Sequence, residues 1–249
     1  MGRAGWLLLL WMLVLPVQAG EVLRVAVASN FLPVARLLAH SFEAETGHRV
    51  KLVPGATGRL YAQIVRGAPF DLFLAADRVR PQRLEREGRI VPGSRRTYAL
   101  GRLVLWSPDP QRIRDGSGIL RRGDFHRLAI ANPRFAPYGR AAREVLERLG
   151  QWQALAPRLV RGENIAQAFH FVQSGNAELG FIAAAQWQAL PAARRGSAWP
   201  VPANLHEPIE QQMVLLSPRP AARAFHAWLL RPESRTLVRR SGYEVPADE

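Results

Sequence analysis

The apolar positions of the chain follow a strand period in some segments and a helix period in others. The helix period is clearest over residues 31–46, where Val34, Leu38 and Phe42 lie four residues apart and form one stripe. Gly47 ends this predicted helix, because glycine tolerates the left-handed conformation of a helix C-terminus. Short apolar runs between turn residues predict strands instead.

These two patterns predict a regular order of elements. Strands are predicted over 23–28, 50–53, the end of the segment 67–77, 98–107, 128–131, 179–183 and 212–216. Helices are predicted over 31–46, 57–64, 81–87, 140–149, 165–173, 221–230 and 234–240. Because strands and helices alternate, the predicted fold class is α/β, with sheets that carry helices on both faces.

The order of the elements also predicts two lobes. A first β/α unit fills residues 20–100, and a second fills residues 101–208. The closing helices, within residues 209–249, are the wrong kind to complete the second unit and are expected to pack on the first sheet. We therefore expect a discontinuous lobe I and an inserted lobe II, joined by two crossing strands near 98–107 and 210–216 that act as a hinge.

Residues 1–19 are predicted to be a cleaved signal peptide, with an uncleaved anchor as the alternative. Arg3 gives a positive start, residues 6–15 form an uncharged apolar core, and Val17-Gln18-Ala19 supplies small residues before the cleavage site. The apolar run is too short for a comfortable membrane span. The chain has no cysteine, which leaves no disulfide and no lipid-modified cysteine. A free periplasmic protein is expected.

The charge of the chain suggests one further class of partner. A formal net charge of +14 in 249 residues could indicate nucleic-acid binding. The arginines, however, are scattered singly or in pairs without interleaved aromatic residues, and Lys51 is the only lysine. An arginine-biased genome explains this composition, so no nucleic-acid partner is expected.

The candidate chemistry lies at four turn-to-helix junctions, which are Ser29-Asn30, Thr57-Gly58, Tyr138-Gly139 and Asn164-Ile165. The first N–H groups of a helix lack intrahelical partners and the helix dipole is positive there, so each junction can bind an anion. In open α/β sheets such junctions emerge at the carboxyl ends of the strands. Two junctions per lobe would surround a small oxyanion with neutral donors. For any one junction alone, ordinary helix capping is the alternative.

Catalytic residues do not form a recognisable arrangement in the sequence. The six histidines are scattered, no Gly-x-Ser-x-Gly turn is present, and the Gly55–Thr57 turn lacks the lysine of a nucleotide-binding loop. Asp71 and Asp77 flank a predicted strand and could be paired carboxylates, but capping of the adjacent turns is the expected role. The protein is therefore not expected to be an enzyme.

Several segments together resemble the periplasmic molybdate-binding proteins of ABC transporters. The matching segments are Ala28–Phe31, Gly55–Gly58, Tyr61–Ile64, Gly67–Asp77, Gly93–Arg95, Thr97–Ala99, Asn132–Pro133, Ala136–Gly139, Leu179–Phe181, Glu207–Ile209 and Gly242–Tyr243. The resemblance covers essentially the whole chain after the signal peptide. It implies a two-lobed type II periplasmic-binding-protein fold, with two mixed sheets and flanking helices, that closes on molybdate and also on tungstate.

The resemblance also implies a ligand set and partners. Carried over by position, the oxyanion is held by Ser29, Asn30, Thr57, Tyr138 and Ile165, through hydroxyl and backbone N–H groups. Ser29 and Thr57 are expected to donate both kinds of hydrogen. No protein atom is expected to bind the molybdenum directly, and no cofactor is expected. The implied partners are the permease and ATPase of an importer at the inner membrane, and the binding protein is expected to be a monomer.

Two positions depart from the family pattern. Part of the family has serine where Thr57 stands, and part has a binding tyrosine where this chain has Ala183. We expect that the Tyr138 phenol can replace that missing hydroxyl from another turn. A solute-binding protein for sulfate, phosphate or a small organic solute is the alternative function, because a sequence does not measure the size of a cavity.

Overall fold

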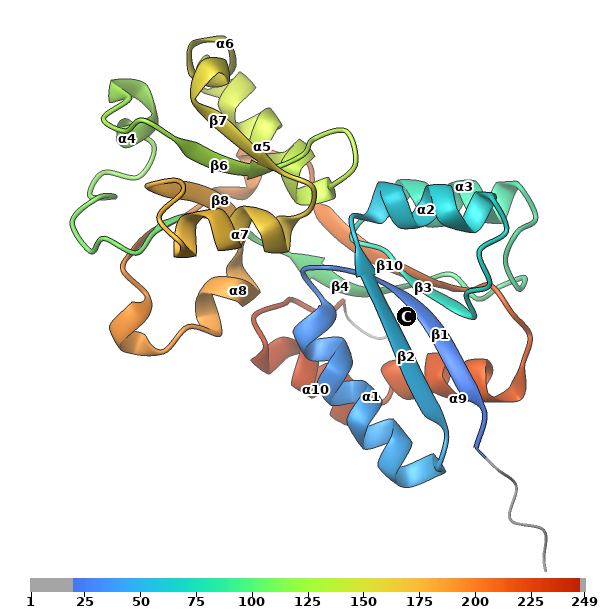
Figure 1. Cartoon of the computed structure of the whole chain (residues 1–249). Helices are drawn as coiled ribbons and strands as arrows, with labels where there is room; N and C mark the ends of the chain where they lie inside the picture. Colours follow the sequence, from blue (N-terminus) through green and yellow to red (C-terminus); the bar gives the residue numbers. More distant parts are fainter. Residues whose placement is uncertain (1–19, 247–249) are drawn as a thin grey trace, which may run out of the picture.

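The computed structural model describes residues 20–246, which form two five-stranded mixed sheets with helices packed on both faces (Figure 1). The predicted signal peptide lies outside the described residues. Sheet A contains β1 (Val22–Ala28), β2 (Arg49–Gly55), β3 (Leu72–Leu74), β4 (Arg96–Gly101) and β10 (Ile209–Leu215). Sheet B contains β5 (Leu103–Ser107), β6 (Leu128–Ala131), β7 (Leu159–Gly162), β8 (Leu179–Ala183) and β9 (Ser197–Pro200). We call sheet A with its helices lobe I, and sheet B with its helices lobe II.

The helices cover the two sheets in layers. Lobe I has α1 (Leu32–Thr46), α2 (Thr57–Val65), α3 (Val79–Arg86), α9 (Pro220–Leu229) and α10 (Pro232–Arg240). Lobe II has α4 (Gly118–Arg122), α5 (Pro137–Arg148), α6 (Trp152–Leu155), α7 (Ile165–Gln173) and α8 (Ala184–Gln188), with 3₁₀ turns η1 (Ala156–Arg158), η2 (Ala192–Arg194) and η3 (Ala203–Leu205). The predicted α/β class with two mixed sheets is confirmed.

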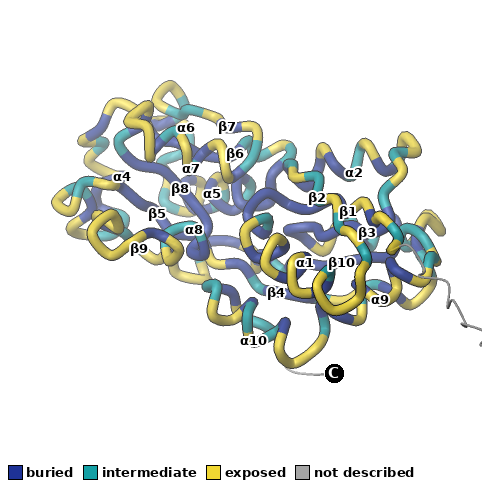
Figure 2. The backbone as a smooth tube through the Cα atoms, turned by 60° about the horizontal axis from the view of Figure 1, so that its bottom comes forward, coloured by how far each residue is buried: buried dark blue, intermediate teal, exposed yellow. Residues whose placement is uncertain are grey.

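Buried residues lie along the strands of both sheets, and exposed residues lie on the outer turns of the helices (Figure 2). One face of sheet A packs against α1, α9 and α10, and the opposite face packs against α2 and α3. Residues alternate between these faces, with Val25 and Val27 on one side and Ala26 on the other. This two-sided burial explains why the strands read as continuous apolar runs.

The two sheets have the same strand order. Sheet A runs β2-β1-β3-β10-β4 and sheet B runs β7-β6-β8-β5-β9. In each sheet the fourth strand is the antiparallel one, since β10 pairs antiparallel with β3 and β4, and β5 pairs antiparallel with β8 and β9. Each of these strands follows directly after a crossing from the other lobe. The lobes are therefore built alike and joined by two crossings.

The crossings differ in detail from the sequence prediction. The single strand predicted over 98–107 is two strands, because β4 ends in sheet A at Gly101 and β5 begins in sheet B at Leu103. The second crossing is the segment 201–208 that contains η3, while the strand predicted near 210–216 belongs to sheet A alone. Gly101 and the exposed Arg102 interrupt the apolar run here, and the prediction took this interruption as lying within one strand.

Some other elements were not predicted, and one helix begins earlier than predicted. The helix predicted over 140–149 begins at Pro137, because proline at the first helical position has a suitable φ and needs no N–H partner. Strands β7 and β9 and helix α8 were not predicted. Strand β9 pairs only with β5, at an edge, and contains Trp199 and Pro200, so its four residues lack a strand pattern. Gly47 ends α1 at φ 71°, as predicted.

None of the helices described between residues 20 and 246 combines the length and the hydropathy that a membrane crossing needs.

Candidate functional site

A small cavity lies between the lobes where strands of both sheets end and helices begin. Its walls come from the ends of β1, β2 and β3 in lobe I and from the first turns of α5 and α7 in lobe II. The lining residues are Ala28, Ser29, Asn30, Gly55, Ala56, Thr57, Ala76, Ala136, Pro137, Tyr138, Asn164 and Ile165. All five residues predicted to hold the oxyanion are in this set.

The cavity is neutral and small. No charged side chain is among its lining residues. Its cavity volume is about 10 Å³, whereas the neighbouring groove between α1, α8 and α10 measures about 290 Å³. Sites for drug-sized organic ligands measure about 300–1,000 Å³. The cavity therefore fits a small ion better than an organic solute.

Thr57 is the first residue of α2, and its hydroxyl is held in place from lobe I. The Ala76 N–H donates to Thr57 Oγ1 over 3.1 Å, and Thr57 is 1% exposed. Because the oxygen already accepts a hydrogen bond, its own hydrogen is free to point into the cavity. The Thr57 N–H belongs to the first turn and has no intrahelical acceptor. One residue thus offers two donors.

Ser29 and Asn30 follow β1 and line the cavity. The Ser29 N–H donates to the Gly55 carbonyl over 3.0 Å, which leaves the hydroxyl of Ser29 for a ligand and does not favour the expected amide contact. The Asn30 side chain donates to Gln211 Oε1 at 2.8 Å and to the Tyr243 hydroxyl at 3.2 Å. Its amide group is therefore structural, which leaves the Asn30 N–H for a ligand.

Tyr138 and Ile165 bring lobe II helix starts to the cavity. Tyr138 is the second residue of α5 and Ile165 the first of α7, so neither N–H has an intrahelical acceptor. Asn164 caps α7 by accepting a hydrogen bond from the Gln167 N–H over 3.1 Å. These two N–H groups face the cavity with the positive ends of two helix dipoles.

The phenol of Tyr138 is placed unfavourably for binding a ligand. A Cβ atom built on Gly101 would lie 2.2 Å from the Tyr138 oxygen, so the phenol packs against the first crossing between the lobes. Burial raises the pKa of this phenol well above its ordinary value, and the nearby Tyr243 and Tyr98 add to the effect. The hydroxyl has no hydrogen-bond partner among residues 20–246. Its geometry does not favour the expected replacement of the missing family tyrosine.

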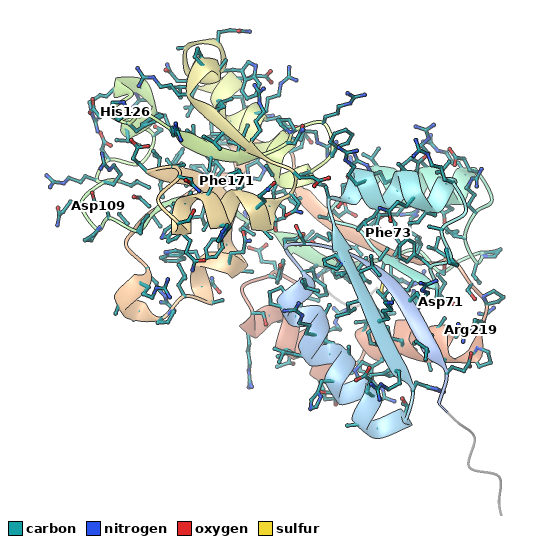
Figure 3. The ribbon with its side chains drawn as sticks, in the orientation of Figure 1. Asp71, Phe73, Asp109, His126, Phe171 and Arg219 are labelled. Carbon is teal, nitrogen blue, oxygen red and sulfur yellow. The ribbon has the colours of Figure 1, made fainter. Side chains whose placement is uncertain are left out.

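The two aspartates around β3 have structural contacts. Asp71 precedes β3 at the end farther from the cavity, where its carboxylate accepts from the Arg24 N–H and pairs with Arg219 at 3.2 Å (Figure 3). Asp77 accepts from the Arg80 N–H at the start of α3 and pairs with the Arg80 side chain. Asp77 caps the adjacent turn as expected, whereas the Asp71 carboxylate contacts Arg24 and Arg219 from distant parts of the chain instead of an adjacent turn.

No group of three or more histidine or acidic residues in the described part of the chain could hold a metal ion. The residues that line the cavity instead carry hydroxyl groups in lobe I and N–H groups at helix starts in both lobes. Such an arrangement can bind an anion whose oxygens accept hydrogen bonds.

Comparison with known proteins places the chain among proteins with this architecture. A family model of bacterial extracellular solute-binding proteins matches residues 23–244. The chain belongs to this family. Among bacterial extracellular solute-binding proteins, it is 47% identical to the molybdate-binding protein ModA of Azotobacter vinelandii over 229 residues, covering 91% of this chain and 90% of the relative. It is 45% identical to ModA of Rhodobacter capsulatus over 234 residues, covering 93% and 91%.

A solved structure agrees with these relatives. The periplasmic molybdate-binding protein of Azotobacter vinelandii superposes with a TM-score of 0.85 at 40% identity, covering 90% of this chain and 100% of that one. The resemblance to periplasmic molybdate-binding proteins read from the sequence is confirmed, and so is the two-lobed fold of solute-binding proteins.

Sequence reasoning missed the residues that hold this site of the solute-binding protein in place. Gln211 and Tyr243 fix the Asn30 side chain from 181 and 213 residues along the chain, and Tyr98 donates to Gln211 Oε1 at 3.3 Å. Tyr98 and Tyr243 lie in segments that carry the family resemblance, but no motif gave them this role, and Gln211 lies in none of those segments. Buried polar side chains among apolar strands, such as Gln211 at 0% exposure, are the signal that points to them.

Proposed function

We propose that this protein binds molybdate, and also tungstate, in the cavity between its lobes and delivers it to an ABC importer. The observation that carries the proposal is the neutral set of hydroxyl and N–H donors from Ser29, Asn30, Thr57, Tyr138 and Ile165 around one small cavity. The two relatives and the solved structure reported above are molybdate-binding proteins, which supports the choice of ligand.

The donor set is sufficient for tight binding of an oxyanion. A hydrogen bond to a charged acceptor contributes about 1.5–3 kcal/mol, so six of them contribute roughly 9–18 kcal/mol before the cost of association. Sub-micromolar affinity needs about 8 kcal/mol after that cost, which the upper part of this range supplies. Neutral donors without nearby carboxylates also disfavour monohydrogen phosphate, because its proton would lack an acceptor.

An organic solute is the weaker alternative, because the cavity of about 10 Å³ is far smaller than the usual organic-ligand site. Sulfate remains the chemically closest competitor, since it is also a tetrahedral dianion that needs only hydrogen-bond donors. Discrimination between sulfate and molybdate would then depend on the size of the closed cavity.

The proposal includes where the protein works and how it moves. We infer a periplasmic monomer exported by the cleaved signal peptide 1–19, which hands its oxyanion to a membrane permease and its ATPase. It carries no catalytic role. Residues 20–100 with 209–249 and residues 101–208 would move as two bodies about the crossings at 101–103 and 201–208, opening and closing the cavity.

Thermal unfolding with molybdate, tungstate, sulfate and phosphate in parallel tests the proposal. A ligand present at about 1,000 times its Kd stabilises the folded protein by roughly 4 kcal/mol. We expect large upward shifts of Tm with molybdate and tungstate and small ones with sulfate and phosphate. A shift with sulfate but none with molybdate would overturn the assignment, and no shift with any of the four would favour the organic solute.

A further inference from the structure

The lobes also touch beside the ligand cavity, where the start of α2 meets the loop before α5 (Figure 1). The Gly58 N–H of lobe I donates to the Phe135 carbonyl of lobe II over 2.8 Å. The Arg59 guanidinium lies 4.3 Å from the centre of the Phe135 ring, and Arg59 Nε lies 3.4 Å from Glu163 Oε1. A backbone hydrogen bond, a cation–π contact and an ion pair thus join the lobes at one place.

This contact adjoins all three helix starts that line the cavity. Arg59 lies in the first turn of α2, Phe135 lies two residues before α5, and Glu163 lies two residues before α7. Any separation of the lobes that opens the cavity must therefore break this contact. Each of the three interactions crosses between the lobes, although Phe135 also packs on the core of lobe II and the Glu163 N–H donates to Gln167 Oε1 within lobe II.

We propose that Gly58, Arg59, Phe135 and Glu163 form a latch that holds the lobes closed over the bound oxyanion and slows its release. The inference rests on the proposed function, since it assigns the latch to the release of that same ligand. The latch residues are positioning residues, because the first turns of α2, α5 and α7 make the ligand contacts and the latch holds these turns at their closed spacing.

With the lobes closed, the position of Gly58 leaves little room for a Cβ atom. A Cβ atom at this position would lie 3.0 Å from the Phe135 carbonyl oxygen and 3.1 Å from the Phe135 Cα, which are backbone atoms of the other lobe. It would also lie 2.8 Å from the end of the flexible Arg80 side chain. Inside α2 itself, alanine is a better helix residue than glycine. The substitution Gly58→Ala therefore opposes closure without opposing the fold of lobe I.

Variants of Arg59 and Glu163 distinguish a latch from simple electrostatic attraction of the ligand. Their side chains are 54% and 59% exposed, so the ion pair and the cation–π contact each contribute only modestly. A latch slows dissociation, whereas a positive charge that attracts an anion from solution speeds association. The two rate constants distinguish these roles.

The experiment measures association and dissociation rates of molybdate by stopped-flow tryptophan fluorescence for the whole mature protein. Variants are Arg59→Met, Glu163→Gln and Gly58→Ala. The matched control is Arg143→Met, because Arg143 pairs with Glu147 at 2.7 Å and lies 5.2 Å from the Trp152 ring centre, all within lobe II. Unfolding of each ligand-free variant is measured alongside.

We expect Arg59→Met and Glu163→Gln to speed dissociation by about 3- to 10-fold and to change association by less than about twofold. Gly58→Ala should speed dissociation by at least about 10-fold, while the Tm of the ligand-free protein stays equal or rises. For the double variant of Arg59 and Glu163, the fold-increase in dissociation rate should be smaller than the product of the two single fold-increases, because the two residues share one contact. Arg143→Met should match the wild type.

Each outcome has a distinct meaning. If wild-type protein binds molybdate and the latch variants dissociate at the wild-type rate, the latch is wrong and the proposed function stands. The latch is also wrong if Arg59→Met changes only the association rate. If wild-type protein binds none of molybdate, tungstate, sulfate and phosphate, the proposed function is overturned and the latch falls with it.

Discussion

At the scale of single residues, Thr57 has the most demanding role, because its hydroxyl accepts from the Ala76 N–H and offers its hydrogen to the cavity. Thr57→Val removes both interactions. We expect molybdate affinity to fall by about 10- to 100-fold, and the ligand-free protein to lose about 1–3 kcal/mol because the Ala76 N–H stays buried without an acceptor. Calorimetric titration and urea unfolding measure the two effects.

Thr57→Ser is the control for this prediction, since it keeps the oxygen and its hydrogen. It should retain affinity within a few-fold. Equal affinity of the valine variant and the wild type would remove Thr57 from the site.

Tyr138 allows the opposite test, in which a substitution is expected to leave the affinity for molybdate unchanged. Its hydroxyl lies against Gly101 rather than in the cavity and has no partner among the described residues, while its N–H faces the cavity. Tyr138→Phe removes an unpaired buried hydroxyl and keeps the N–H, so molybdate affinity should stay within about threefold and stability should not fall. A large loss of affinity in titration would instead assign the phenol to the ligand.

The residues around the cavity show what the sequence could predict at this scale. Helix starts with free N–H groups follow from local patterns, so the positions Thr57, Tyr138 and Ile165 were predictable. Which N–H and side-chain groups stay free for a ligand depends on partners that are distant in the sequence. The Ser29 N–H is taken by Gly55, and the Asn30 amide by Gln211, through strand pairing and packing that no short motif encodes.

At the scale of elements, the sequence predicts strands and helices that carry their own signal and misses those that depend on a partner. Strands β6 and β8 were predicted over the residues they occupy, because both are buried apolar runs. Strand β7 has four residues, one of them the exposed Arg161, and depends on its pairing with β6. The change of sheet is marked only by Gly101 and the exposed Arg102 within an otherwise apolar run, and such a short interruption does not show that the strand changes sheet.

The crossing at Gly101 yields a prediction of its own. A Cβ atom there would lie 2.2 Å from the Tyr138 oxygen of lobe II and 3.1 Å from Ile209 Cγ2. Gly101→Ala should therefore disfavour the closed arrangement and weaken molybdate binding by about 10-fold, a cost within the range of overpacking. Adding Tyr138→Phe removes the nearest atom and should restore part of the affinity, as measured in a double-mutant cycle. Simple additivity of the two changes would contradict this geometry.

Helix α9 carries a pH-sensitive contact with the segment before β4. His226 Nε2 lies 2.7 Å from the Ser94 carbonyl, and burial lowers the pKa of His226 although this contact acts in the other direction. The unfolded chain therefore binds a proton more readily than the folded one. Stability should be full above about pH 6.5 and fall as the pH drops below it.

His226→Gln should reduce this loss, as measured by urea unfolding at pH 7.5 and 5.5. The matched control variant is His40→Gln, which changes the same residue type at an exposed position of α1, away from the Ser94 contact. An unaltered slope in the His226 variant would show that other groups set it.

At the scale of the whole molecule, ligand affinity should not depend on pH near neutrality. The only ionisable side chain lining the cavity is the Tyr138 phenol, whose pKa is raised well above its ordinary value by burial. We expect the Kd for molybdate to stay within about twofold between about pH 6 and 9, because no lining group changes charge there. A tenfold change in titrations across this range would reveal an ionisable group that acts on the site.

The strand order of sheet A also determines when the protein can finish folding. Strands β3 and β4 are not neighbours, because β10 lies between them and pairs with both. Sheet B is continuous in sequence from β5 to β9, so lobe II can be complete while lobe I still waits for residues 209–215. A growing chain therefore carries two unpaired sheet edges until its synthesis is nearly finished, and such edges invite aggregation. Although lobe I is synthesised first, its sheet is completed last, so it is the part of the nascent chain that stays prone to aggregation longest.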